Sequence, residues 1–85
     1  MALIRWKNKA LKQYTKLPNN IRSNVKQAVE NLEFFPEIAN VKKLKNHESD
    51  YRLRVGDYRV LFSLVENEPV ILLIEKVAKR DDRTY

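Results

Sequence analysis

The sequence contains no cysteine, one glycine and one histidine among its 85 residues. Without cysteine the chain can form no disulfide framework and no thiolate zinc site, and it has no cysteine nucleophile. A single histidine, His47, cannot supply a histidine-rich metal centre either. We therefore expect a function that uses neither a metal ion nor another cofactor.

Long apolar segments are also absent from the sequence. The longest apolar run, Val70 to Ile74, is far shorter than the roughly 20 residues needed to cross a bilayer. The first residues, Met-Ala-Leu-Ile-Arg-Trp, do not have the layout of a signal peptide. The sequence therefore indicates a cytoplasmic protein without a membrane partner.

Charge is what the sequence has in abundance. Hydrophobic residues make up 44% of the chain and charged residues 33%, a balance typical of a globular protein, and we expect one small domain over residues 1–85. The chain has 17 Lys and Arg against 11 Asp and Glu, which gives a net charge of +6. Because positive charge attracts polyanions over long range, nucleic acid or an acidic protein is the expected partner.

The first half of the sequence has a strand pattern followed by two helical patterns. Alternation over residues 2–6 indicates a short strand, and apolar residues three and four apart indicate a helix over residues 7–17. Pro18 ends this helix, and Asn19 or Asn20 is expected to cap a second helix through its side-chain oxygen. The apolar stripe of the second helix, which we expect to pack on a sheet, comprises Ile21, Val25, Ala28, Leu32 and Phe35.

The second half changes to a period of two. Residues 36–50 form a polar connection, anchored by Val41 and Leu44, and strand-like alternation follows it. Gly56-Asp57 signals a two-residue turn of the primed type, and a last strand over residues 70–77, apolar on both faces, is expected to be central. The predicted fold class is therefore α+β: an N-terminal strand, a helical hairpin and an antiparallel strand meander packed on the helices.

The turn at Gly56-Asp57 also fixes how its two strands pair. Arg54 then lies opposite Arg59, with Arg52 on the same face, while the other face is apolar. Facing like charges lower stability, and although isolated surface arginines are often merely solvated, three on one face favour an anion site. Guanidinium groups bind phosphate oxygens two at a time and keep their charge, so they suit phosphate but cannot act as a general base.

The segment from Tyr51 to Phe62, with Val77-Ala78-Lys79-Arg80 and Tyr85 further along, resembles the RelE/ParE superfamily of toxin–antitoxin toxins. The resemblance covers nearly the whole chain, because the elements occur in the same order. The RelE branch, which the sequence resembles more than the ParE branch, cleaves messenger RNA in the ribosomal decoding site without a metal ion. The resemblance thus implies an endoribonuclease that inhibits translation, with the ribosome, mRNA and a cognate antitoxin protein as its partners.

The resemblance further implies which residues bind the substrate. Arg52 and Arg54 match the basic pair on the strand after the long connection, and Lys79 precedes the basic position that follows the last strand. The family often has lysines where Arg52 and Arg54 stand, so a role that requires a titrating lysine does not carry over. Phosphate binding does carry over, while Lys79 either binds the substrate or faces outward.

Three residues are the catalytic candidates that the resemblance implies. Arg59 and Arg80 would hold the phosphate and stabilise its developing charge. Tyr85 would be the base that takes the proton of the ribose 2′-hydroxyl, because nearby guanidinium groups favour the phenolate and lower a tyrosine pKa from about 10.

Other residues and other functions stay open. His47 has the side chain that titrates nearest neutral pH, yet a lone histidine in a polar loop is more often an ordinary surface residue, so it ranks below Tyr85. The lysines of the connection, Lys42, Lys43 and Lys45, either contact RNA or solvate the loop. A ParE-like inhibitor of DNA gyrase would share the fold and the antitoxin, and a non-catalytic nucleic-acid binder would also explain the positive charge.

Overall fold

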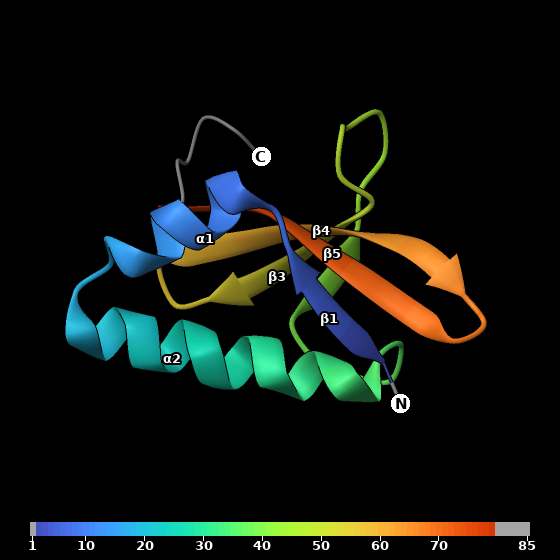
Figure 1. The fold of residues 1–85 in the computed structure, drawn as a ribbon, viewed down its shortest axis with the longest axis horizontal. Coiled ribbons are helices and arrows are strands. Elements are labelled where there is room, and N and C mark those ends of the chain that lie inside the picture. Colours follow the sequence, from blue (N-terminus) through green and yellow to red (C-terminus); the bar gives the residue numbers. More distant parts are fainter. Residues whose placement is uncertain (1, 80–85) are drawn as a thin grey trace.

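A five-stranded mixed sheet forms the body of the molecule, in the order β1-β5-β4-β3-β2 (Figure 1). The structure is a computed structural model and describes residues 2–79. Its strands are β1 (Leu3–Trp6), β2 (Val41–Lys43), β3 (Tyr51–Val55), β4 (Tyr58–Asn67) and β5 (Val70–Lys79). Strand β1 is parallel to β5, and every other neighbouring pair is antiparallel. The prediction that the last strand is central is confirmed, because β5 lies between β1 and β4.

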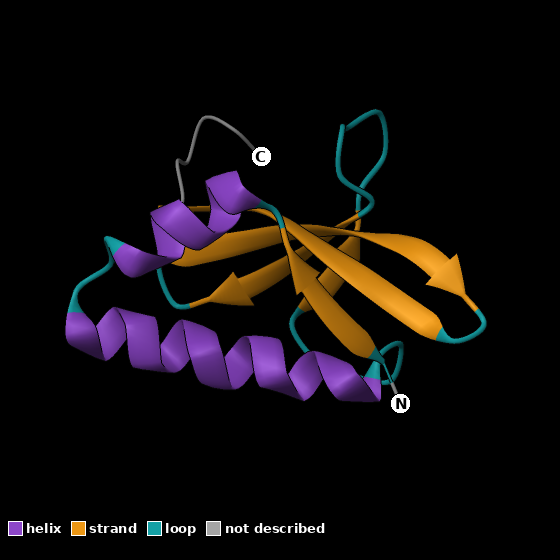
Figure 2. Cartoon of the chain, viewed as in Figure 1, coloured by secondary structure: helices purple, strands orange, loops and turns teal. Residues whose placement is uncertain are grey.

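Two helices pack against this sheet, a short one beside β5 and a longer one that runs below the strands in the view of Figure 2. They are α1 (Asn8–Thr15) and α2 (Asn19–Glu30), and the short 3₁₀ helix η1 (Asn31–Phe34) follows α2. The predicted second helix is therefore shorter than expected, because its last turn tightens into a 3₁₀ turn, as is common at helix ends. The predicted cap is wrong: Pro18 precedes α2 without a capping side chain, and Asn19 Oδ1 instead accepts a hydrogen bond from Arg22 Nη2 at 2.5 Å.

The helices bury their apolar faces against the sheet. Fully buried side chains come from both layers, and the largest of them are Phe62, Leu32, Leu72, Ile74, Val25 and Val60. The predicted apolar stripe is confirmed, since Ile21 and Ala28 of α2 and Phe35 after η1 pack against this core as well. We call the face of the sheet away from α2 the open face.

The β3–β4 hairpin has the predicted register. Val55 pairs with Tyr58, Arg54 with Arg59 and Leu53 with Val60. Gly56 has a φ of 57°, whereas Asp57 is not among the residues with positive φ. A positive φ at the first turn residue occurs in the primed turns, which suit a right-handed twisted hairpin. The chain therefore places its one glycine where the turn requires it.

The polar connection contains a strand that the sequence analysis did not predict. Strand β2 pairs with β3 through Val41 and Leu53, Lys42 and Arg52, and Lys43 and Tyr51. The loop that follows, residues 44–50, is closed by a hydrogen bond from Leu44 N–H to Asp50 C=O at 2.8 Å. This β2–β3 loop lies on the other side of the sheet from α2 (Figure 1).

None of the helices in residues 2–79 is long and apolar enough to span a membrane.

Candidate functional site

Cross-strand pairing gathers cationic residues on the open face. Residues paired on neighbouring strands share a face of the sheet. Arg52 pairs with Lys42 on one side and with Leu61 on the other, and Leu61 pairs in turn with Lys76. The next row along the sheet consists of Arg54, Arg59 and Ala78. The prediction that three arginines share one face is confirmed, and Lys42 joins them there.

A hollow of roughly 590 Å³ opens around Arg59. Its walls are Lys7, Lys9, Asn46, His47, Glu48, Ser49, Arg59, Leu61, Glu75 and Lys76. The wall of the hollow thus contains four Lys or Arg side chains and two Glu side chains. Arg59 is only 6% exposed, and removing a guanidinium group from water is costly unless other groups compensate for it. A half-enclosed basic hollow with a rigid, buried guanidinium group suits a phosphate ligand.

Glu75 reaches this hollow because strand β5 is irregular at that point. Leu61 pairs with Lys76, but the next residue of β4, Phe62, pairs with Ile74, so Glu75 is one extra residue on β5. Such a β-bulge lets two successive residues point to the same face. Ile74 and Val77 therefore both enter the core, while Glu75 and Lys76 between them both line the hollow.

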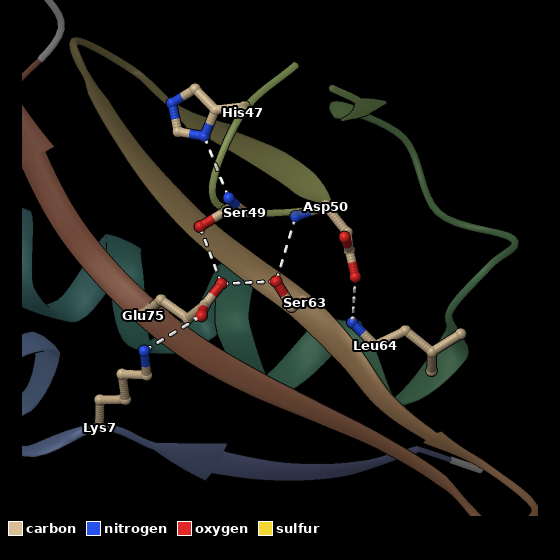
Figure 3. Close-up of polar contacts among 7 residues, drawn as sticks. All are labelled: Lys7, His47, Ser49, Asp50, Ser63, Leu64 and Glu75. Atoms are coloured by element: carbon tan, nitrogen blue, oxygen red, sulfur yellow. Dashed lines mark hydrogen bonds and ion pairs between the residues drawn. The ribbon is translucent and has the colours of Figure 1, made fainter. Parts of the chain in front are cut away.

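The Glu75 carboxylate links three segments of the chain (Figure 3). Its Oε1 accepts hydrogen bonds from Ser49 Oγ at 2.8 Å and from Ser63 Oγ at 2.5 Å. Its Oε2 lies 3.2 Å from the Lys7 ammonium group, just after β1. Asp50 adds to the linkage, because its backbone N–H donates to Ser63 Oγ at 3.1 Å. The β2–β3 loop is thereby fastened to β4 and β5 across the open face.

These contacts change the acidity of Glu75. Burial opposes ionisation and by itself raises the pKa of the carboxyl group. The hydrogen bonds from Ser63 and Ser49, together with the nearby Lys7 ammonium group, favour the carboxylate more strongly. The net result is a pKa below the ordinary value for glutamate, so Glu75 is a carboxylate at neutral pH.

His47 lies in the β2–β3 loop and forms part of the wall of the Arg59 hollow. Its Nδ1 accepts a hydrogen bond from Ser49 N–H at 3.1 Å (Figure 3). His47 also lines a second hollow of roughly 420 Å³. The other residues of that hollow are Lys42, Lys43, Leu44 and Lys45. The sequence analysis ranked His47 low because a lone histidine in a polar loop has no pattern that shows what the loop folds against.

The residues predicted for the site have different positions in the structure. Arg59 lines the hollow, and Arg52 and Arg54 share its face of the sheet without being part of its wall. Lys79 pairs with Tyr58, so the register places it on the helix-packed face, opposite to Arg59. Arg80 and Tyr85 lie outside the described residues.

The sequence analysis did not assign Glu75, Lys76 or Lys7 to the site. Glu75 and Lys76 stand as two successive polar residues between the apolar Ile74 and Val77, and this break in the period of two is the signal for a bulge. Lys7 was assigned to the first helix, but it precedes α1 and contacts Glu75. Within residues 2–79 there is no group of three acidic or histidine side chains that could hold a metal ion.

The chain is similar to known toxins in sequence. The profile of the family described as "ParE toxin of type II toxin-antitoxin system, parDE" matches residues 4–83. A curated protein of Methanocaldococcus jannaschii, "Putative toxin RelE1", is 29% identical over 76 residues. The aligned part covers 86% of this chain and 83% of that protein.

The fold is similar to that of solved RelE structures. One chain of the archaeal RelE–RelB complex from Pyrococcus horikoshii OT3 matches with a TM-score of 0.77 and 27% identity, over 95% of this chain and 97% of that chain. A chain of the RelBE2 toxin–antitoxin complex from Mycobacterium tuberculosis matches with a TM-score of 0.76 and 26% identity, over 92% and 96% of the two chains. The isolated Escherichia coli RelE toxin has a TM-score of 0.76 at 22% identity, over 93% and 84%, and shares the fold. The predicted fold is thus confirmed, and the chain belongs to the RelE/ParE superfamily as a toxin of a type II toxin–antitoxin system.

Proposed function

We propose that this toxin is a ribosome-dependent endoribonuclease that cleaves mRNA and thereby inhibits translation. The observation that carries the proposal is the buried Arg59 in a basic hollow on the open face, with Arg54 opposite it on the neighbouring strand. Such an arrangement suits a polyanion whose phosphate enters the hollow. The similarity to RelE proteins supports the same assignment.

The proposed reaction is an intramolecular attack within the RNA. The ribose 2′-oxygen forms a bond to the adjacent phosphorus, and the bond from phosphorus to the 5′-oxygen breaks. A base removes the proton of the 2′-hydroxyl, and an acid returns a proton to the leaving 5′-oxygen. The products are a 2′,3′-cyclic phosphate and a 5′-hydroxyl, so no external water is consumed.

The proposed roles follow the chemistry of each side chain. Arg59 and Arg80 bind the reacting phosphate and stabilise the charge that develops on its oxygens. Tyr85 is the base, since guanidinium groups near a phenol favour the phenolate. Arg52 and Arg54 bind neighbouring phosphates from the same face as Arg59. Lys79, on the opposite face by register, takes no part in the proposed contact.

A cognate antitoxin is the proposed protein partner in the cytoplasm. The similar structure from M. tuberculosis is a toxin–antitoxin complex, and the one from P. horikoshii is a complex of RelE with RelB. A chain with a net charge of +6 favours an acidic and apolar partner segment. Co-expression with the neighbouring reading frame should restore growth and yield a co-purifying complex, and a toxin that stays fully active beside that protein would refute the pairing.

Primer extension on mRNA after a short pulse of toxin expression tests the proposed activity. Cuts at fixed positions within codons support the proposed RNA cleavage. Blocked DNA supercoiling without such cuts would instead indicate a ParE-like gyrase inhibitor, which the matching family profile keeps as the second candidate. Neither effect would indicate a nucleic-acid binder without catalytic activity.

A further inference from the structure

We propose that Glu75 is a positioning residue, which holds the β2–β3 loop on the open face so that His47 donates a hydrogen bond from Nε2 to the anion in the Arg59 hollow. The activity tests of this inference rest on the RNA cleavage proposed above. Its structural test does not depend on cleavage. Glu75 itself is proposed to act only through the loop and not on the substrate.

The first argument is that a β-bulge and three side-chain contacts hold Glu75 on the open face. The bulge in β5 turns Glu75 from the core face to the open face. There its two carboxylate oxygens contact Ser49, Ser63 and Lys7, from three different segments. Ser49 is only 4% exposed, so the hydrogen bond between the loop and the strand is largely shielded from water. Hydrogen bonds to an ionised acceptor are about twice as strong as neutral ones.

The second argument is that Ser49, which is bonded to Glu75, also holds the imidazole ring of His47. Ser49 donates through Oγ to Glu75 and through its backbone N–H to His47 Nδ1. The position of the ring therefore depends directly on whether Ser49 stays on Glu75. Figure 3 shows this sequence of contacts from Lys7 through Glu75 and Ser49 to His47.

The third argument concerns what the held ring can do. An Nδ1 that accepts a hydrogen bond carries no proton, so the neutral ring carries its proton on Nε2. In this arrangement neither nitrogen can accept a further proton without breaking the contact with Ser49. His47 is therefore a hydrogen-bond donor toward a phosphate oxygen and not the base of the reaction. The charged groups that share the hollow with it are Lys7, Lys9, Glu48, Arg59, Glu75 and Lys76.

The structural test is the scalar coupling between the Ser49 amide nitrogen and His47 Nδ1 across their hydrogen bond, measured by NMR on untagged toxin at about pH 8, where imidazole is ordinarily neutral. The chain has one histidine, so the imidazole signals need no assignment. We expect the coupling in wild type and its loss or weakening in Ser49→Ala and Glu75→Gln. Ser23→Ala, an exposed position on α2, is the matched control and should keep the coupling. Full coupling in both Ser49→Ala and Glu75→Gln, with the remaining amide spectrum native, would overturn the proposal.

The activity test is a double-mutant comparison in single-turnover cleavage of ribosome-bound mRNA. Ser49→Ala and His47→Ala should each slow cleavage about tenfold to a hundredfold, the scale of a misplaced contact. The double variant should be no slower than His47→Ala alone, because Ser49 acts through His47. Multiplied effects in the double variant would overturn the proposal. If wild type itself cleaves no RNA, the proposed function fails, and the NMR coupling decides the positioning role alone.

Discussion

Arg54 and Arg59 lie directly opposite each other across the β3–β4 hairpin, with Arg54 exposed and Arg59 only 6% exposed. Like charges at this spacing destabilise a strand pair. The hairpin could place an apolar or acidic residue at either position without changing its turn. Under the proposed function Arg54 and Arg59 bind phosphate groups of the RNA, so stability and function should separate at this position.

Arg54→Gln tests that separation. The variant keeps most of the side-chain stem and removes one positive charge facing Arg59, so the free energy of unfolding should stay equal or rise by about 0.2 to 1 kcal/mol. RNA binding should weaken. The slope of the logarithm of the binding constant against the logarithm of the salt concentration should become shallower by about 0.7 for each single-strand phosphate that the variant no longer neutralises. Thermal unfolding at low and high salt, beside the cleavage assay, measures both effects.

Arg5→Gln is the matched control for the stability effect. Arg5 lies on β1 and pairs with Leu73, so the variant removes the same charge without relieving a facing cation. The free energy of unfolding should therefore be higher for Arg54→Gln than for Arg5→Gln. The difference should be larger at low salt, where charges are screened less. A strong loss of stability in Arg54→Gln with unchanged cleavage per folded molecule would show that the arginine is structural.

Gly56→Ala tests the turn that fixes this pairing. A Cβ at this position would meet no atom within 4 Å, so crowding is not the obstacle. The φ of 57° is the obstacle, and an alanine there should cost about 1 to 2 kcal/mol of unfolding free energy. Gly56→Asn should be less destabilised, because asparagine tolerates this conformation better. Urea unfolding distinguishes the variants, and an equal loss in both would contradict the conformational explanation.

The lowered pKa of Glu75 predicts how stability depends on pH. Because the folded carboxyl group releases its proton at a lower pH than the unfolded one, the unfolded chain binds more protons between the two pKa values, and stability rises with pH there. The contribution is complete above the unfolded pKa of about 4.3 and is lost as the pH falls through the folded pKa. Glu75→Gln should therefore flatten the pH dependence of the unfolding free energy below about pH 4.5. Parallel wild-type and variant curves from urea unfolding at pH 3 to 6 would refute this account.

Much of the fold could be predicted because its signals are local. Helical spacing identified α1 and the stripe of α2, and Gly56-Asp57 fixed the register that sets Arg54 against Arg59. The boundaries were less accurate, since a helix end depends on how its last turn packs. The shared face of the three arginines was predictable for the same reason, because alternation on both sides of a known turn decides which side chains share a face.

The remaining parts depend on contacts between distant segments. Strand β2 has three residues and one apolar side chain, Val41, so only its pairing with β3 makes it a strand. The hollow requires the β2–β3 loop to fold over the open face, and Ser49 meets Glu75 at a separation of 26 residues. No periodicity in residues 44–50 indicates that contact, which is why His47 was ranked low.

Tyr85→Phe tests the proposed base. Removal of the hydroxyl group should lower the single-turnover rate of mRNA cleavage by about 10² to 10⁴-fold and leave ribosome binding intact, the range expected for a general base. Tyr58→Phe, a half-buried tyrosine on β4, is the control for removal of a phenol elsewhere and should cleave at the wild-type rate. An unchanged rate in Tyr85→Phe would remove this residue from the mechanism.

The most direct test of the central claim is a single-turnover reaction of purified toxin with mRNA-programmed ribosomes, with chemical analysis of the new RNA ends. We expect cuts in the decoding site that leave a 2′,3′-cyclic phosphate and a 5′-hydroxyl. Arg59→Gln should slow the reaction by about 10² to 10³-fold, as for removal of a group that stabilises developing charge, while Lys26→Gln on α2 should not. Absence of cleavage by folded wild-type toxin, or equal rates for wild type and folded Arg59→Gln, would contradict the account.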